Sequence, residues 1–488
     1  MRRRGLFAGA LCLCLSVWVA PSGGSEDQRH LSSSPYTVSV TLTTADMRQA
    51  MSARPSLRSS PQARPRYPLV EVNDQSRFQR FNGIGGAMTD TSAWLLEDGL
   101  LPVERDRWMT NLFSRRAVGL NFLRVPIGAS DFTVHGSPYS YDDLPPGHVD
   151  PRLKRFSIVH DLAYVIPALR QALSVNPATL LLASPWSPPP WMKGNHQFNN
   201  IQHKGTILTS DEPSLAAYIV KFLQAYASQG IHVKAITVQN EPSVQSNYPG
   251  ATLPASQESD LIARYLHPAL RRAELSAVSI YGYDGSWGGY AWDVAGGPAG
   301  GDLAGISWHC YVGSPDLMRR FHGYQPRFDQ VVGECATPPR PSTSAVLITS
   351  FRSWASRVAM WNLALDPDGG PVQHPNIACA GCTGIITVDP STHTAKPTLD
   401  YYQLAQFGHY VRPGATRIDS STFVTQDVNP PKTYGLNDVA FQNPDGETVL
   451  IVNNDAKVTK PFTVGDRGQY FSYRLAPGAT VTFTWRAS

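Results

Sequence analysis

"VKAITVQNEP" (residues 233–242) is a short apolar run that ends in three residues of another kind, Asn240, Glu241 and Pro242. Its length, its apolar character and the proline after it predict a buried β-strand. A carboxylate directly after a buried strand is a candidate functional group. What it can do depends on how many such strands the chain contains and how they are connected.

Seven further runs have the same appearance, and segments of helical period separate them. Eight buried strands that alternate with helical crossovers over about 300 residues favour an α/β fold of the (β/α)8 TIM-barrel type over a doubly wound sheet. The seven runs are FNGIGGAMTD (81–90), GLNFLRVPIG (119–128), TLLLASPW (179–186), VSIYGYDG (278–285), GISWHCYVG (305–313), QVVGECAT (330–337) and VAMWNLAL (358–365).

The segment SDEPSLAAYIVKFLQAYASQG (210–230) illustrates the helices between the strands. Its large apolar residues recur at intervals of three and four, which predicts a helix with one buried face. We expect Ser210 to cap its start, Pro213 to lie in its first turn and Gly230 to end it.

From about residue 415 the chain changes to strands without helices, which predicts a β-sandwich. Two N-terminal strand-like pieces, residues 36–43 and 68–74, are expected to join it, because isolated strands need partners for their edges. Residues 53–67 between them are rich in Pro, Arg and Ser and predict a loop. The expected regions are a signal peptide (1–25), the N-terminal strands and loop (36–75), the catalytic barrel (76–405) and the C-terminal sandwich (406–488).

Charge and the N-terminus limit the classes of function. The chain has 42 Lys and Arg against 38 Asp and Glu, a net charge of +4. This balance does not fit a nucleic-acid-binding protein. The basic start and the apolar run at residues 6–20 predict a secretory signal peptide, exported by the Sec or twin-Arg route, with an N-terminal anchor as the alternative. We expect a secreted protein without a transmembrane segment in the mature chain.

Four cysteines remain after the predicted signal peptide: Cys310, Cys335, Cys379 and Cys382. The stretch CAGC (379–382) is compatible with a local disulfide or with half of a zinc site. Zinc needs about four ligands, and the sequence offers no second pair at suitable spacing, so a structural disulfide is favoured.

Two of the predicted strands end in glutamates, Glu241 and Glu334. In a barrel of this type, functional groups lie at the C-terminal ends of the strands. Two carboxylates held roughly 5 Å apart there are what a retaining glycosidase needs. The alternatives are a turn residue for Glu241 and a salt-bridged carboxylate for Glu334.

Other residues at the same strand ends suit a sugar ligand. Trp186 and Trp361 offer flat apolar faces, although single tryptophans are often core residues. Asp90 could accept sugar hydroxyl groups or, alternatively, cap the helix that follows. Tyr311 could hydrogen-bond a neighbouring carboxylate or be a core residue.

Several stretches together resemble glycoside hydrolase family 30, and most closely its glucosylceramidase (glucocerebrosidase) branch. The resemblance covers most of the mature chain and implies a retaining β-glucosidase on a barrel joined to a β-sandwich, with no metal or other cofactor. The stretches are FNGIGGAMTD, LRVPIGASDF, ASPWSPPPWMK, NEP, WHCY, GE, WNLALDPDGGP and YYQLAQFGHYVRPGATRI.

The resemblance also implies roles for individual residues. Glu241 matches the family's acid/base and Glu334 its nucleophile. The remaining matches are Asp90, Trp186, Asn240 and Trp361 as glucose-binding residues, and Arg124, Tyr311 and, more weakly, His309 as supporting residues. Arg124 could equally be a buried salt-bridge partner.

One departure concerns the substrate. After WNLALDPDGGP the chain continues VQHPNIACAGCTGIITVD, whose two cysteines look more like the β-1,6-glucanase branch of the family. The main hypothesis is therefore a β-glucosidase of the glucosylceramidase type, acting on a β-glucoside such as a glycolipid. The alternatives are a β-1,6-glucanase and a non-catalytic carbohydrate-binding protein.

Overall fold

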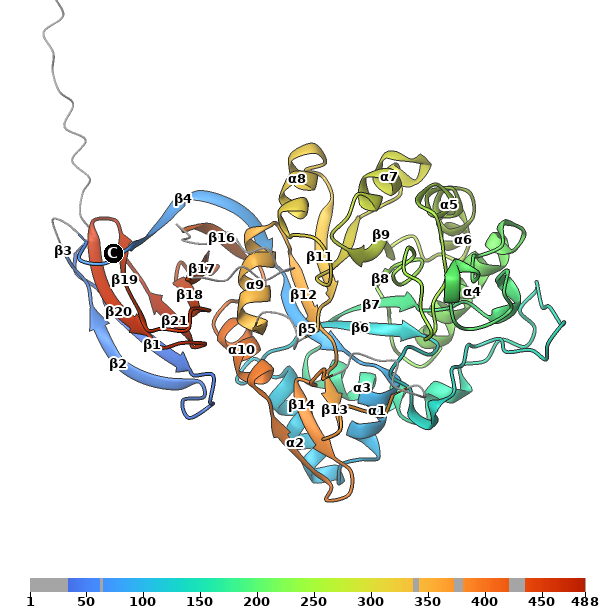
Figure 1. Ribbon diagram of the computed structural model, residues 1–488, viewed down its shortest axis with the longest axis horizontal. Coiled ribbons are helices and arrows are strands. Elements are labelled where there is room, and N and C mark those ends of the chain that lie inside the picture. Colours follow the sequence, from blue (N-terminus) through green and yellow to red (C-terminus); the bar gives the residue numbers. More distant parts are fainter. Residues whose placement is uncertain (1–33, 62–64, 337–341, 373–380, 421–434, 488) are drawn as a thin grey trace, which may run out of the picture.

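The computed structural model describes residues 34–61, 65–336, 342–372, 381–420 and 435–487. The predicted signal peptide and Cys379 lie outside these residues. Figure 1 shows two parts, a barrel surrounded by helices and a β-sandwich at one side of it. None of the helices in the described ranges is long and apolar enough to cross a membrane.

The predicted barrel is confirmed: eight parallel strands close on themselves in the order β5 to β12. Each of the eight predicted runs contributes one strand. The strands are β5 (Gly83–Ala87), β6 (Phe122–Ile127), β7 (Leu180–Pro185), β8 (Ala235–Ile236), β9 (Ser279–Ser286), β10 (Gly305–His309), β11 (Asp329–Glu334) and β12 (Arg357–Met360).

A layer of apolar side chains fills the barrel interior, because six of its strands each contribute one buried residue to a single cluster. Because the interior is filled, a functional site is expected at the C-terminal ends of the strands, where the polar residues lie. The six residues are Phe122, Leu182, Ala235, Tyr281, Val331 and Ala359.

Helices surround the barrel, as the helical periodicity predicts. The segment 210–230 forms a helix from Glu212 to Ser228, and Gly230 follows it with a φ of +78°. The prediction that Ser210 caps this helix is wrong, because Asp211 occupies the cap position and its side chain makes no capping hydrogen bond. The helices are α1 (Asp90–Glu97), α2 (Pro102–Phe113), α3 (Val165–Val175), α4 (Glu212–Ser228), α5 (Ala255–Leu261), α6 (His267–Arg272), α7 (Tyr290–Gly296), α8 (Asp316–Tyr324), α9 (Thr343–Arg352) and α10 (Leu399–Gly408).

The N-terminal strands join the C-terminal ones in one ten-stranded sheet, as predicted, with the order β2-β1-β21-β18-β17-β16-β4-β19-β20-β3. Figure 1 shows the blue N-terminal strands beside the red C-terminal ones. The strands are β1 (Thr37–Thr43), β2 (Ser52–Arg58), β3 (Ser60–Pro61), β4 (Leu69–Phe81), β16 (Ala415–Ser420), β17 (Leu436–Gln442), β18 (Thr448–Asn454), β19 (Lys460–Asp466), β20 (Gln469–Leu475) and β21 (Thr480–Trp485).

The prediction of a loop over residues 53–67 is wrong for its first half. Residues 52–58 form β2, which pairs antiparallel with β1 at the end of the sheet. Its side chains are mostly exposed. Arg and Pro are residues that protect such an edge strand from further pairing, so their presence is compatible with a strand at this position. A small third sheet, made of β13 (Ala364–Leu365), β14 (Ile386–Asp389) and β15 (Thr394–Pro397), follows β12.

Candidate active site

Glu241 and Glu334 lie together at the C-terminal end of the barrel. Glu334 is the last residue of β11, and Glu241 follows β8 in a left-handed backbone conformation, with a φ of +46°. One carboxylate oxygen of each and one ring nitrogen of His309 all lie within 4.8 Å of one another. The separation of the two glutamates is thus close to the spacing of about 5 Å that a retaining glycosidase uses.

Asp284 is a buried carboxylate that the sequence analysis did not select, although it lies in the run VSIYGYDG. It is the extra residue of a bulge in β9, because Ser307 of β10 pairs with Tyr283 while the next residue, Trp308, pairs with Gly285. Its φ of +72° accompanies this irregularity. A bulge of this kind re-aims a side chain.

The Asp284 carboxylate collects hydrogen bonds from residues around the barrel. Burial alone would raise the pKa of Asp284, but Arg124 and His309 hold it well below its usual range. Asp284 is therefore an anion at the centre of the site. The donors are Arg124 through both terminal nitrogens (2.7 and 2.8 Å), Ser184 (2.5 Å), Thr237 (2.8 Å), Ser307 (2.7 Å) and His309 (3.1 Å).

The backbone around Asp284 is held as well. The Asp284 carbonyl accepts the backbone N–H of Glu241 at 2.8 Å. The backbone N–H of Tyr283 donates at 2.8 Å to Oε1 of Glu258, a fully buried carboxyl group on α5. Burial raises the pKa of Glu258 to about 8, so this group is uncharged at neutral pH.

His309 connects the carboxylates. Its Nδ1 lies 3.2 Å from Glu241 Oε1 and its Nε2 lies 3.1 Å from Asp284 Oδ1. Burial lowers the pKa of His309, but the negative charge of Glu334 and the contacts with Asp284 and Glu241 outweigh it and raise the pKa to about 9. At neutral pH the ring is an imidazolium, and both nitrogens donate.

Arg124 fits both of the roles considered for it. It is fully buried and paired with Asp284, and it also donates to Asn240 Oδ1 at 2.7 Å. Its Nε lies 3.5 Å from Glu334 Oε2. The guanidinium carbon also lies 4.8 Å from the centre of the Trp186 ring.

Tyr311 and Tyr248 bind the two glutamates. Tyr311 donates to Glu334 Oε1 at 2.8 Å, the contact expected for it. Tyr248, which the sequence analysis did not select, donates to Glu241 Oε2 at 3.1 Å. Burial, with a smaller contribution from the charge of Glu241, raises the pKa of Glu334 above its usual value. His309 and Arg124 act in the opposite direction and limit this rise.

Trp186 and Trp361 lie face to face, with ring centres 5.1 Å apart and an interplanar angle of 19°. Both are buried. Phe132 packs edge-on against Trp361 at 5.7 Å, and Tyr248 and Tyr311 border the same cluster. The two tryptophans thus lie together, as expected, and their binding of a sugar remains a prediction.

Asp90 lies at the barrel mouth, where its binding of a sugar remains a prediction. Its two carboxylate oxygens are bound to His160 Nε2 at 2.9 Å and to the backbone N–H of Val134 at 2.8 Å. It does not cap α1, because Thr89 accepts the N–H of Ser92 in that role. Asp90 therefore connects two loops at the barrel mouth.

Asp131 is a second acidic residue that the sequence analysis missed. It follows β6 within the stretch LRVPIGASDF, is buried, and its Oδ1 has no hydrogen-bond partner among the described residues. Burial and the nearby charge of Glu334 raise its pKa well above the usual range. A buried polar atom without a partner next to two glutamates suits a ligand hydroxyl group. Its position shortly after a barrel strand was the signal that could have identified it.

Glu241, His309 and Glu334 are close enough together for a metal ion. A metal ion would have to compete with the proton of His309, whose pKa is raised to about 9. The arrangement suits acid–base and nucleophilic chemistry by the carboxyl groups themselves.

Cys310 and Cys335 form a disulfide between the ends of β10 and β11. The sequence analysis favoured a disulfide between Cys379 and Cys382. Cys382 is disulfide-bonded, but Cys379 lies outside the described residues.

Comparison with known proteins gives two matches to family models. Residues 81–289 match the glycosyl hydrolase family 30 TIM-barrel domain, and residues 414–483 match the glycosyl hydrolase family 30 β-sandwich domain. The first range contains β5 to β9 with Glu241 and Asp284, and the second contains most of the C-terminal strands.

Individual relatives agree with the family models. An endo-1,6-β-D-glucanase of Aspergillus fumigatus is 33% identical over 85% of this chain and 86% of its own length. The lysosomal acid glucosylceramidase of Mus musculus is 28% identical over 86% of this chain and 83% of its own. Among solved structures, SrfJ from Salmonella typhimurium superposes with a TM-score of 0.83 at 26% identity, covering 93% of this chain and 100% of that one.

Proposed function

The chain belongs to glycosyl hydrolase family 30, and from that premise we propose that it is a retaining endo-β-1,6-glucanase. Membership makes it a glycosidase. The observation that supports a retaining reaction is the short distance between Glu241 and Glu334, with oxygens within 4.8 Å. An inverting enzyme needs about 6.5–9.5 Å between its carboxyl groups to admit a water molecule.

We assign the nucleophile to Glu334 and the acid/base to Glu241. Arg124, His309 and Tyr311 all lie against the Glu334 carboxylate, an arrangement that suits the anion of a nucleophile. Glu241 lies nearer the rim, with a side chain 12% exposed, where it can exchange protons with water. These environments suit a fixed anion and a proton donor, respectively.

In the first step, Glu334 attacks the anomeric carbon and forms a bond from its carboxylate oxygen to that carbon. Glu241 gives its proton to the glycosidic oxygen, the bond to this oxygen breaks, and the leaving sugar departs as an alcohol. Glu241 is left as an anion. His309, which donates to Glu241 Oε1, stabilises that charge.

In the second step, Glu241 removes a proton from a water molecule, and the water oxygen attacks the same carbon. The bond to Glu334 breaks and the carboxylate is restored. Two displacements return the β configuration. His309 keeps its proton in both steps, because Asp284 holds its other nitrogen.

The bound sugar ring requires further contacts. We expect four residues to line its site: Asn240, Trp186, Trp361 and Asp131. Asn240 precedes Glu241, the tryptophan pair packs against the tyrosines that bind the two glutamates, and Asp131 lies near the charge of Glu334. Asp90 supports this site indirectly, through His160 and Val134.

The similarity to relatives supports a β-1,6-glucan as the substrate. The fungal endo-1,6-β-D-glucanase is 33% identical to the chain, and the mouse glucosylceramidase is 28% identical over nearly the same share of it. The two cysteines after the eighth barrel strand also favour a β-1,6-glucan, because they resemble the β-1,6-glucanase branch of the family. The second candidate is the glucosylceramidase type, which the 28% identity over 86% of the chain supports. In either case we expect export by the N-terminal segment 1–25.

Product analysis tests the proposal. The purified protein would be given a linear β-1,6-glucan and, separately, glucosylceramide in detergent. Glu334→Ala serves as the inactive control. Glu104→Ala serves as the matched control, since its surface ion pair with Arg107 contributes little to stability.

Short β-1,6-linked oligosaccharides from the glucan, produced by the unaltered protein and by Glu104→Ala but not by Glu334→Ala, are the expected result. Glucose and ceramide from the lipid, with the glucan left intact, would replace the proposal with the second candidate. If neither substrate gives a product, the glucanase and the glucosylceramidase candidates are both contradicted. The hypothesis of a non-catalytic carbohydrate-binding protein would then be favoured.

A further inference from the structure

Strands β10 and β11 change their pairing by one residue just before the nucleophile. Trp308 pairs with Val332, but the next residue, His309, pairs with Glu334, so that Gly333 is an extra residue. A shift of one residue exchanges the two faces of a strand. In the unshifted pairing, Glu334 would lie opposite Cys310 and point away from His309.

The extra residue has no room for a side chain. A Cβ atom on Gly333 would lie 2.3 Å from Ser307 Oγ and 2.9 Å from Arg124 Nη1. The buried pair of Arg124 and Asp284 therefore packs directly against this bulge, and the bulge turns Glu334 toward the same pair.

On the side away from β10, few hydrogen bonds hold the end of β11 against β12. Between β11 and β12, only Val331 and Val332 pair. Past these residues, the connection is a hydrogen bond from the Trp361 N–H to the Cys335 carbonyl at 2.8 Å. The nucleophile thus lies on a segment that depends on β10 for its register.

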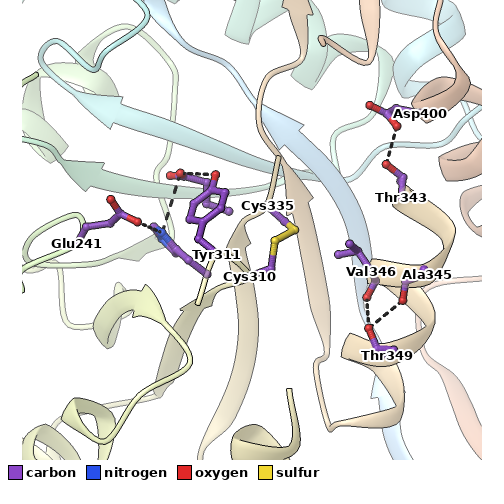
Figure 2. The surroundings of a disulfide bond; sticks show 11 residues. Glu241, Cys310, Tyr311, Cys335, Thr343, Ala345, Val346, Thr349 and Asp400 are labelled. Atoms are coloured by element: carbon purple, nitrogen blue, oxygen red, sulfur yellow. Dashed lines mark hydrogen bonds and ion pairs between the residues drawn. A yellow bond between two sulfur atoms is a disulfide. The ribbon is translucent and has the colours of Figure 1, made fainter. Parts of the chain in front are cut away.

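The Cys310–Cys335 disulfide joins the two strands directly after the shifted pair. Its Cα atoms are 5.2 Å apart, and both cysteines are fully buried. Figure 2 shows the bond between the two strands, with Tyr311 and Glu241 on one side and α9 on the other. The disulfide connects the residue after His309 to the residue after Glu334.

The residues on both sides of Cys310 contact the active carboxylates. His309 lies 3.2 Å from Glu241, and Tyr311 donates to Glu334 at 2.8 Å. A slip of β11 against β10 would break the contact of Tyr311 with Glu334 and would move Glu334 away from His309, whose Nδ1 lies 4.0 Å from Glu334 Oε1. We propose that the Cys310–Cys335 disulfide is a positioning element for catalysis, which locks the shifted register and so keeps the carboxylate of Glu334 directed at the anomeric carbon. This inference rests on the proposed role of Glu334 as the nucleophile.

The double variant Cys310→Ala/Cys335→Ala tests it without leaving an unpaired thiol at either position. The primary measurement is the covalent labelling of Glu334 by a glucose-configured cyclitol epoxide, followed by mass spectrometry of the labelled peptide. This reagent needs only the site for one sugar ring, so the result does not depend on whether the natural substrate is a glucan or a glycolipid. We expect the limiting rate constant of labelling to fall about 10- to 100-fold, as for a displaced nucleophile, with the inhibitor's binding constant changed less than about threefold.

Val165→Ala is the matched control for a loss of stability alone, because Val165 is buried on α3, belongs to the core outside the barrel and takes no part in the pairing of β11. It should label at the unaltered rate well below its melting temperature. Labelling of the double variant within about twofold of the unaltered protein would overturn the inference. So would an equal loss in Val165→Ala, because the effect would then come from stability and not from register. Labelling of a residue other than Glu334 in the unaltered protein would remove the premise.

Glucan hydrolysis by the same proteins separates this inference from the proposed function. Labelling that falls in the double variant, together with an unaltered protein that does not cleave the glucan, would contradict the proposed substrate and retain the positioning role of the disulfide.

Discussion

Asp284 holds Glu241 by two routes. Its backbone carbonyl accepts the Glu241 N–H at 2.8 Å, and its carboxylate binds His309, whose other nitrogen donates to Glu241 Oε1. The same carboxylate binds Arg124, which lies 3.5 Å from Glu334. One residue of a bulged strand thereby orients both glutamates.

Asp284→Asn should remove the charge at this centre while keeping the shape of the side chain. Arg124 and His309 would then lack their buried counter-charge, and we expect kcat/KM to fall about 100-fold or more. Stability should fall by about 3–5 kcal/mol, the cost of breaking a buried ion pair. Hydrolysis rates and urea unfolding measure the two effects.

The control for this variant is Asp293→Asn, an exposed carboxylate on α7. It should leave both quantities unchanged. Activity of Asp284→Asn within threefold of the unaltered protein would show that the hydrogen bonds suffice and that the charge is not needed.

The pKa of His309 predicts how stability changes with pH. Its value in the folded protein is raised from 6.5 to about 9. The charged His309 ring therefore stabilises the folded protein fully below pH 6.5, and this contribution is lost as the pH rises through 9. Its size is roughly 3 kcal/mol, from the linkage between the pKa shift and the free energy of unfolding.

Urea unfolding of the unaltered protein and of His309→Gln at pH 6 and pH 10 measures this effect. The difference in free energy of unfolding between the two proteins should shrink by roughly 3 kcal/mol at the higher pH. Titrating groups that do not contact His309 contribute equally to both proteins, so most of the change belongs to His309 and the carboxylates bound to it. A difference that is the same at both pH values would mean that His309 is not charged in the folded protein.

Sequence patterns located residues at the ends of apolar runs. Glu241 and Glu334 could be selected because each ends an apolar run, and the barrel explains why such ends meet. Asp284 lies in a run that was also recognised, but its inward direction depends on a bulge and on a left-handed backbone at a residue other than glycine. Neither feature can be deduced from an alternating pattern.

The errors in the fold prediction have local causes. Residues 52–58 form a strand although they are rich in Arg, Ser and Pro, because pairing with β1 outweighs their low intrinsic preference for strands. Asp90 follows a glycine-rich strand at the barrel mouth, as a ligand-binding residue would, and its binding of a sugar stays a prediction. Its contacts with His160 and Val134 involve residues far away in the sequence, which no pattern near Asp90 indicates.

The contacts of Lys193, a residue away from the two glutamates, predict that its replacement lowers the free energy of unfolding. Burial lowers the pKa of its amino group to about 7, and Nζ lies within hydrogen-bond distance of four oxygens: the carbonyls of Gly250 (2.6 Å), Phe198 (2.8 Å) and Asn199 (3.0 Å), and Ser187 Oγ (3.0 Å). These contacts connect the loop after β7 with the loop that carries Glu241. Lys193→Met would leave four acceptors without a donor and should cost about 3 kcal/mol or more.

Urea unfolding and limited proteolysis measure the change. Cleavage by a protease should become faster between residues 187 and 205 in Lys193→Met. Lys204→Met is the control, because Lys204 lies on the same loop and is exposed. Equal stability of the two variants would mean that water satisfies the acceptors.

The roles assigned to the two glutamates predict that, in the presence of azide, the two variants form glycosyl azides of opposite anomeric configuration. Glu334→Ala should lose at least about 10⁴-fold in kcat, because no covalent intermediate can form. Azide fits the space left by the carboxylate and attacks the anomeric carbon once, so the product is an α-glycosyl azide. In Glu241→Ala the intermediate still forms on Glu334, and azide attacks it from the other face to give a β-glycosyl azide. An activated aryl glycoside as substrate and NMR of the products distinguish the two, and a β product from Glu334→Ala would exchange the roles of the glutamates.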